Sequence, residues 1–343
     1  MDWATGKHNA ITDVPGIRVG HWTDRKGATG CTVVRCEDSQ FVAVDSRGGA
    51  PGTRETDVLG GANVVRKSHA IVMTGGSAFG LGAADGVMRW CAEHEIGFPT
   101  TVRRVPIVSA AVLFDLSVGS ASAFPDQNAG YAAVSRARAG RVAEGSVGAG
   151  AGATICKLLG PERALRAGIG TTSVVGPRGI VVGAIVATNA AGLIYDPDTG
   201  RQVAGPRDDA GGFVSLEETV RRRTAPMEAL LENTTLVCVA TNATLQHHQL
   251  QRMAIHAHDG LARTVLPAHT FSDGDTVFAI GMGGIEPNAD DSLIVGVLAM
   301  HAVQVAILRS VTLAKGTRRL PSAPEWALAG IPATAIAGNP GHS

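Results

Sequence analysis

Residues 232–243 read ENTTLVCVATNA, and residues 269–281 read HTFSDGDTVFAIG. In each segment a short polar cluster stands directly before a run of apolar and β-branched residues, the pattern of a buried strand that begins after a turn. The first cluster contains Asn233 and Thr234, and the second contains Asp273, Gly274 and Asp275. These two strand starts are therefore the first places to look for both the fold and the chemistry.

Outward from these segments, short runs rich in Val, Ile and Thr alternate with helical patterns. Strands are expected at 30–36, 41–46, 70–75, 179–189, 234–243 and 275–281. Helices are expected at 78–95, 245–262 and about 291–313. In the second helix Leu250, Met253, Ala254, Ala257 and Leu261 recur at helical spacing and form one apolar face. This alternation predicts an α/β or α+β protein with layered sheets and helices.

The composition is that of a packed globular chain. Of 343 residues, 45% are hydrophobic and 17% are charged, and 30 basic residues balance 30 acidic ones. A net charge of zero without a basic run argues against nucleic acid or an anionic membrane surface as the partner. The apolar stretch 293–308 is shorter than the ~20 residues that span a bilayer, so it is expected to be a buried core helix.

Several common sites are not favoured by the sequence. The five cysteines form no CxxC pair, which favours buried thiols in a reducing compartment. The first residues, MDWATGKHNAITD, lack the basic start and apolar region of a signal peptide, and a cytoplasmic location is expected. The glycine-rich segment 145–152 lacks the GKS or GKT of a phosphate loop. His247, His248, His256 and His258 lack HExxH spacing, so surface or capping roles are favoured over a zinc site.

One polar segment, residues 196–233, interrupts the strand rhythm and ends at Asn233-Thr234. A threonine hydroxyl is a poor nucleophile unless a base lies within hydrogen-bond reach. If the chain were cut before Thr234, the new α-amine, with a reference pKa of ~7.7, could act as that base. From the residues alone an ordinary turn is the favoured interpretation, because Asn-Thr pairs are common turn residues, and cleavage before Thr234 remains as the alternative.

The chain as a whole resembles the DmpA-like family of self-cleaving aminopeptidases, which includes the β-aminopeptidases and the nylon-oligomer endohydrolases. The resemblance extends over nearly the whole length, in blocks that occur in the same order. The matching blocks are 11–24, 43–57, 74–81, 144–160, 182–192, 232–243 and 269–281.

This resemblance implies an α+β fold, a four-layer αββα sandwich, in a single domain of residues 1–343. It implies an N-terminal-nucleophile hydrolase that cuts itself between Asn233 and Thr234. The products would be an α chain of residues 1–233 and a β chain of residues 234–343, which stay together. The family usually forms tetramers of such αβ pairs, so a homo-oligomer is expected.

Individual residues of the family site can be matched to this sequence. Thr234 matches the nucleophile, and Asp273 and Asp275 match the pair that orients its free amine. Asn189 matches an asparagine of the oxyanion hole, and Lys157 matches a lysine of the threonine-type, nylon-hydrolase-like branch. No metal or cofactor is implied. Each of these residues also has an interpretation without a catalytic role. The Asp-Gly-Asp sequence could be only a turn, Asn189 could be a turn former at the end of a strand, and Lys157 could be a surface lysine.

One position departs from the family pattern. Many relatives place a tyrosine hydroxyl near the oxyanion, whereas the matching block, residues 109–119, has Phe114. Because phenylalanine cannot donate a hydrogen bond, Phe114 either weakens the oxyanion hole or contacts the substrate. This difference bears on the substrate rather than on the fold.

The function favoured by the sequence is hydrolysis of an amide bond next to a free amino group, in a small peptide or aminoacyl amide. The amino group could be in the α, β or a more distant ω position. Two alternatives remain: an acyltransferase of the ornithine acetyltransferase type, in which an amine replaces water, and a non-catalytic binding protein on the same fold.

Overall fold

A computed structural model of the protein describes residues 3–223, 233–317 and 319–329. Its largest sheet has nine strands in the described part of the chain. Along the sheet these are β10 (Ile169–Val175), β11 (Val181–Asn189), β14 (Thr234–Ala243), β16 (Thr276–Ile285), β2 (Thr29–Ser46), β4 (Lys67–Thr74), β7 (Val108–Val112) and β3 (Thr53–Arg54), with β1 (Ile17–Asp24) paired to β2.

The long strand β2 joins two halves of this sheet. Its first part lies between β1 and β4, where Cys31 is opposite Trp22 on one side and Thr74 on the other. Its last part pairs with β16, where Ser46 is opposite Thr276. The sheet therefore continues from the β10-β11-β14-β16 half into the β1-β2-β4-β7 half without a break in hydrogen bonding.

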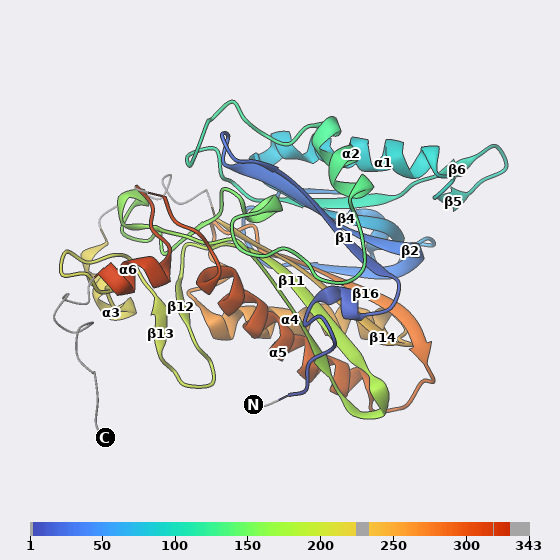
Figure 1. The fold of residues 1–343 in the computed structure, drawn as a ribbon. Coiled ribbons are helices and arrows are strands. Elements are labelled where there is room, and N and C mark those ends of the chain that lie inside the picture. Colours follow the sequence, from blue (N-terminus) through green and yellow to red (C-terminus); the bar gives the residue numbers. More distant parts are fainter. Residues whose placement is uncertain (1–2, 224–232, 318, 330–343) are drawn as a thin grey trace, which may run out of the picture.

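Helices cover the outer face of each half (Figure 1). The helices α1 (Ala83–Glu93) and α2 (Gln127–Ser135) pack on the half that contains β4 and β7. The helices α4 (His247–Thr264) and α5 (Asp291–Thr312) pack on the half that contains β10, β11 and β14. The order of layers is helix, sheet, sheet, helix, which confirms the αββα sandwich; the two sheet layers share β2.

The alternation of side chains along β14 shows why this strand is apolar throughout. Leu236, Cys238 and Ala240 belong to the buried cluster between the two sheet halves. Val237 and Val239 belong to the cluster beneath α4 and α5. A strand that is covered on both faces must be apolar at successive positions, and this is what the sequence LVCVA provides.

The helix α5 matches the expected core helix but is longer than the apolar stretch in its centre. Its 22 residues are long and apolar enough to cross a membrane. In the structure it packs against α4, β10 and β11, and the residues from Val295 to Val311 that face them are buried. Its apolar character is explained by this packing in the core.

Several strands differ from the sequence-based expectation. The segments 30–36 and 41–46 are one strand, β2, because the polar residues between them continue the extended backbone. The strands β1, β7 and β10 were not anticipated, and the segment 78–95 begins with a 3-10 turn, Ser77–Gly82, before α1. The remaining elements are β5 (Phe98–Pro99), β6 (Arg104–Val105), β8 (Thr154–Ile155), β9 (Leu165–Arg166), β12 (Leu193–Tyr195), β13 (Gln202–Ala204), β15 (Val265–Leu266), α3 (Leu216–Arg222) and α6 (Ala323–Ala329), with short 3-10 turns at Ile11–Asp13, Asp57–Leu59, Gly148–Gly150, Pro161–Arg163 and Pro177–Gly179.

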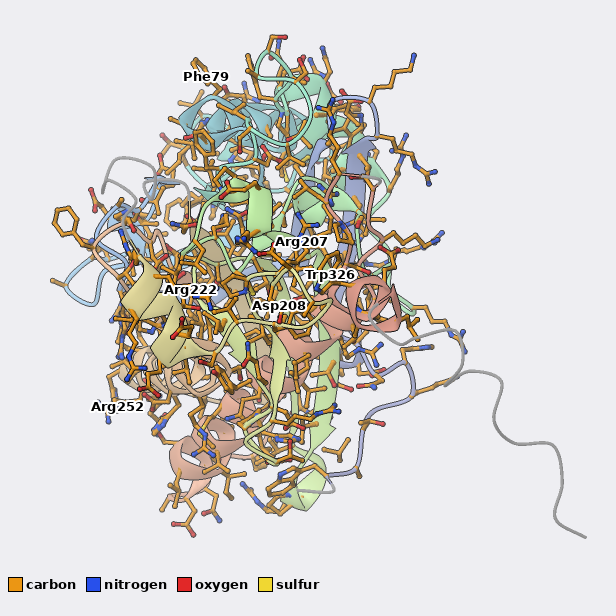
Figure 2. The ribbon with its side chains drawn as sticks, turned by 90° about the vertical axis from the view of Figure 1, so that its left-hand side faces the viewer. Phe79, Arg207, Asp208, Arg222, Arg252 and Trp326 are labelled. Atoms are coloured by element: carbon orange, nitrogen blue, oxygen red, sulfur yellow. The ribbon has the colours of Figure 1, made fainter. Side chains whose placement is uncertain are left out.

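The polar segment 196–233 forms part of the surface beside α6. The side chains of Arg207 and Trp326 lie together in Figure 2, with the guanidinium 5.0 Å from the centre of the indole ring. The indole N–H of Trp326 donates a hydrogen bond to the carbonyl of Gly212 at 2.8 Å. Residues 224–232 of this segment lie outside the described residues.

Candidate active site

The predicted nucleophile lies at the end of the sheet where three strands meet. Thr234 is the first residue of β14 and Asn189 is the last of β11, and the antiparallel register places the two opposite each other. Asn233 forms a parallel bridge with Asp273, just before β16. The amide of Gly274 donates to the Asn233 carbonyl at 2.9 Å. Residues far apart in sequence are thus assembled at one sheet edge.

The bond between Asn233 and Thr234 is held next to the threonine hydroxyl. Thr234 Oγ1 donates a hydrogen bond to the Asn233 carbonyl oxygen at 2.5 Å. Both residues are buried, with 3% of Asn233 and 5% of Thr234 exposed. The hydroxyl therefore lies beside the carbonyl group that it would attack, in a site from which bulk water is largely excluded.

Gly274 leaves the space that this hydroxyl occupies. A β-carbon built on Gly274 would lie 2.6 Å from Thr234 Oγ1 and 3.0 Å from the Ala50 carbonyl oxygen. Because the hydroxyl of Thr234 occupies this space, the central residue of the Asp-Gly-Asp sequence has to be glycine. The structure therefore gives this sequence a role in the site beyond that of a turn.

The two aspartates have different contacts. Asp275 accepts a hydrogen bond from the Thr235 amide at 2.7 Å, while its second oxygen lies 2.9 Å from His269 Nδ1. Asp273 accepts from the Thr270 amide at 2.6 Å. Burial raises the pKa of Asp273 to about 6, and the negative charge of Asp275 adds to this shift. Asp275 therefore anchors the start of β14, and Asp273 is a carboxyl group that titrates near neutrality.

Asn189 and Lys157 form one hydrogen-bonded unit beside Thr234. Lys157 Nζ donates to the Asn189 backbone carbonyl at 3.1 Å and to its side-chain Oδ1 at 3.2 Å. The Thr154 amide also donates to Asn189 Oδ1, at 3.0 Å. The positive charge of Lys157 acts on Asp273 and lowers its pKa, against the effect of burial. Lys157 is thus part of the candidate site and not a solvated surface lysine.

Phe114 reaches the same unit through its backbone. Asn189 Nδ2 donates to the Phe114 carbonyl oxygen at 3.0 Å. The block 109–119 therefore borders the candidate oxyanion hole, as the resemblance implies. This hydrogen bond uses the backbone carbonyl of residue 114, so it does not depend on whether the side chain there is phenylalanine or tyrosine.

Restoring this hydroxyl is expected to assist the reaction. The resemblance to relatives with a tyrosine here implies that a tyrosine at position 114 would offer a donor where negative charge develops, and only interactions that strengthen in the transition state raise kcat. We expect Phe114→Tyr to raise kcat on a simple aminoacyl amide ~10-fold with little change in KM. Steady-state kinetics of the two proteins check this. An increased KM with unchanged kcat would instead show that the ring contacts the substrate.

His269 was not selected by sequence reasoning, although it lies in the quoted block 269–281. Its Nδ1 contacts Asp275, and its ring packs edge-on against the His258 ring, with centroids 4.7 Å apart. His258 Nε2 lies 2.9 Å from the Asp45 carbonyl oxygen, and burial lowers the pKa of His258 to about 4. His269 therefore supports the carboxylate that fixes the start of β14.

A loop after β2 forms another wall of the site. The amide of Ala50 donates to the Asp273 carbonyl at 2.8 Å, and the amide of Arg47 donates to the Asp275 carbonyl at 3.0 Å. These bonds hold residues 47–50 against the Asp-Gly-Asp sequence. The sequence contains a feature that could have indicated this contact. The block 43–57 has two adjacent glycines, which permit the close approach of another backbone segment.

Solved structures with a similar fold include the following two. One is the L-aminopeptidase D-Ala-esterase/amidase of Ochrobactrum anthropi, described as a variant of the N-terminal-nucleophile hydrolase fold, with a TM-score of 0.71 and 20% identity over 94% of this chain and 93% of that one. The other is a β-aminopeptidase of a Burkholderia species, with a TM-score of 0.73 and 23% identity over 99% and 97% of the two chains. The fold is that of an N-terminal-nucleophile hydrolase.

Sequence comparison narrows this class to one family. The model of peptidase family S58 matches residues 9–321, so the chain belongs to that family. A protein of Mycobacterium leprae named as an uncharacterised aminopeptidase is 41% identical over 92% of this chain and 93% of its own length. A 6-aminohexanoate-oligomer endohydrolase of Kocuria is 30% identical over 90% of this chain and 84% of its own. The chain is thus an enzyme, an aminopeptidase or amidohydrolase of this family.

Proposed function

We propose that this hydrolase cuts its own chain between Asn233 and Thr234 and then uses Thr234 as an N-terminal nucleophile. The observation that carries the proposal is the contact of Thr234 Oγ1 with the Asn233 carbonyl at a buried strand start. The position of Gly274, which leaves room for this hydroxyl, supports the same assignment.

In the self-cleavage step, Thr234 Oγ attacks the carbonyl carbon of Asn233. The hydroxyl proton passes to the leaving nitrogen as the C–N bond breaks, which gives an ester between Asn233 and Thr234 and a free amine on Thr234. Water then hydrolyses the ester and leaves a carboxylate on Asn233. The amide of Gly274, which already donates to the Asn233 carbonyl oxygen, is placed to stabilise the oxyanion.

In the second reaction the same groups act on a substrate amide. The Thr234 amine takes the hydroxyl proton, Oγ attacks the substrate carbonyl, and the amine returns the proton to the leaving nitrogen. The acyl ester is then hydrolysed by water. The proposed roles of Asn189 and Lys157 are to hold the developing oxyanion, and those of Asp273 and Asp275 are to orient the amine.

The substrate is proposed to carry a free amino group near the scissile bond. Hydrolysis of α-, β- and ω-aminoacyl p-nitroanilides should be compared with that of the same compounds after N-acetylation. We expect the free amines to be the better substrates, because the buried aspartates favour an ammonium group. Equal rates for the acetylated compounds would contradict an aminopeptidase, and turnover that occurs only when an amine acceptor is added, with no hydrolysis in its absence, would indicate an acyltransferase.

The two reactions should differ in their dependence on pH. During self-cleavage the Thr234 amine does not yet exist, so we propose that Asp273 takes the hydroxyl proton and passes it to the leaving nitrogen. Its carboxyl group is neutral below its pKa of about 6 and is charged, and able to act as this base, above it. We expect self-cleavage to be half-maximal near pH 6 and hydrolysis by the cut enzyme to be half-maximal nearer the ~7.7 of an α-amine. Rates measured from pH 4.5 upward on uncut and cut protein test this. Identical acid limbs would contradict the assignment.

We also propose that the protein forms a homo-oligomer of αβ pairs and that it is located in the cytoplasm. The glycine- and alanine-rich segment 78–95 does not by itself support an interface between copies, because Gly86 of α1 packs against the Gln127 carbonyl of α2 in the same chain. The support comes from the family resemblance. Light scattering should give a multiple of the 35.1 kDa protomer, and a mass equal to one protomer at micromolar concentration would contradict it.

A further inference from the structure

One cavity of the described structure is lined by residues that have no part in the candidate active site. Its volume is about 350 Å³, and it is bordered by the turn between β1 and β2, the glycine-rich loop at 144–151 and the segment after α5. The charged residues of its wall are Asp24, Arg25, Glu144, Arg166 and Lys315. None of the residues assigned above to catalysis lines it.

Arg166 on β9 is the unusual member of this wall. Only 4% of the residue is exposed. Its Nη2 donates to the Ala151 carbonyl, while Nε and Nη1 are buried and have no hydrogen-bond partner among the described residues. Burial lowers the pKa of Arg166. Because a guanidinium is a five-fold donor that cannot be neutralised in a protein, two unmet donors are costly unless acceptor oxygens reach them.

The nearby carboxylates are engaged elsewhere. Glu144 is paired with Arg309 and also accepts a hydrogen bond from the Thr171 amide at 2.9 Å. Asp24 accepts from the amides of Lys26 and Gly27, both at 2.9 Å. These two acids therefore complete other contacts in the fold and do not satisfy Arg166.

Asp115 is the remaining acidic group near Arg166. Its charge acts on Arg166, but no ion pair joins the two in the described part of the chain, and Asp115 is not part of the cavity wall. One of its oxygens accepts from the Gly76 amide at 2.7 Å. Burial raises the pKa of Asp115 to about 6. Its other oxygen, Oδ2, is buried without a hydrogen-bond partner among the described residues, so Asp115 does not accept from the two unmet donors of Arg166.

We propose that this cavity is a binding site for a small anion with carboxylate or phosphate oxygens. Arg166 would bind the anion from the inner end, and Arg25 and Lys315, whose side chains are exposed, would attract it at the rim. The volume is in the range of small-molecule sites and accommodates a molecule of amino-acid size. Planar carboxylates and phosphates match the paired donors of a guanidinium.

The position of Arg166 connects this site to the catalytic edge of the sheet. Arg166 pairs with Thr154 across β8 and β9, and the amide of Thr154 donates to Asn189. The proposed anion site and the oxyanion asparagine therefore both contact the strand pair β8 and β9, the anion site through Arg166 and the asparagine through Thr154. Binding must consequently be measured with probes that the catalytic site does not recognise.

Isothermal titration calorimetry on the purified full chain in low-salt buffer tests the proposal. The probes are inorganic phosphate and N-acetylglycine, which has a carboxylate but no free amine; glycinamide, which has an amine but no carboxylate, is the control. We expect one of the anions to bind with one site per protomer and glycinamide to give no signal. Phosphate alone, or N-acetylglycine alone, would identify which oxygen group the site selects.

Variants then locate the binding. Arg166→Gln should abolish it, and Arg25→Ala with Lys315→Ala should weaken it ~10-fold or more, since two charges at the rim are lost. Lys26→Ala removes an exposed cation next to Arg25 that does not line the cavity, and it should leave the affinity unchanged. If Arg166→Gln does not fold, the rim variant decides. Absence of saturable binding for both anions, or equal affinity of the rim variant and Lys26→Ala, would overturn the proposal.

Discussion

Replacing Thr234 by alanine is expected to leave one uncut chain of 35.1 kDa without hydrolase activity. The substitution removes the hydroxyl group that lies beside the Asn233 carbonyl, and without cleavage no N-terminal amine is formed to act as base. Because alanine fits in the space of threonine at a buried strand start, the fold should be retained. Electrophoresis and hydrolysis of an aminoacyl p-nitroanilide measure both effects.

Thr234→Ser is the matched control. It keeps the hydroxyl and removes one methyl group, so the chain should still be cut at the same bond and remain active. If Thr234→Ala is also cut at this bond during purification, an external protease performs the cleavage and the autocatalytic account is wrong.

Gly274→Ala is expected to slow self-cleavage ~100-fold or more, because a displacement of a reacting group by about 1 Å can cost that much. The added methyl group would lie 2.6 Å from Thr234 Oγ1, which is shorter than any relaxed contact, and the Ala50 carbonyl on the other side prevents a shift away. The hydroxyl would therefore be displaced from the Asn233 carbonyl. The fraction of cut chain is followed over time after synthesis.

Gly82→Ala is the control for this substitution, since a β-carbon at Gly82 meets no atom within 4 Å. It should be cut at the normal rate. A Gly274→Ala protein that is cut as fast as the Gly82→Ala protein would show that Thr234 does not use the observed geometry.

The local part of the site could be predicted from the sequence. Thr234 and the Asp-Gly-Asp sequence stand where polar residues meet apolar strands, and both strands begin within a residue of the expected positions. The heptad-like face of α4 was also correct, and all five of its apolar residues are buried. These features depend on residues that are close together in the chain, so the pattern of side chains is sufficient to reveal them.

The contacts between segments could not be predicted in this way. That Asn189 lies opposite Thr234 depends on the register of β11 and β14, which are separated by a long polar segment. The role of Gly274 depends on the same assembly, because its neighbours Thr234 and Ala50 belong to another strand and another loop. His269 contacts Asp275 within its own segment, but its ring packs against His258 of α4. Family resemblance supplied Asn189 and Lys157, but it gave no reason for the space that Gly274 leaves.

One of the missed strands has a sequence that forms strands weakly. β7 reads VSAAV, so alanine and serine dilute the β-branched pattern. β10 reads IGTTSVV, in which five of seven residues are β-branched and only the glycine and the serine interrupt them. These residues are small because both strands are completely or almost completely buried between layers. For β7, tertiary packing rather than local propensity determines the conformation.

The central claim is tested most directly by the intact mass and N-terminal sequence of the purified wild-type protein. The account predicts two fragments, residues 1–233 and 234–343, with threonine as the first residue of the second fragment. A single chain of 35.1 kDa that nevertheless hydrolyses aminoacyl amides, or a new N-terminus at any other residue, would contradict it.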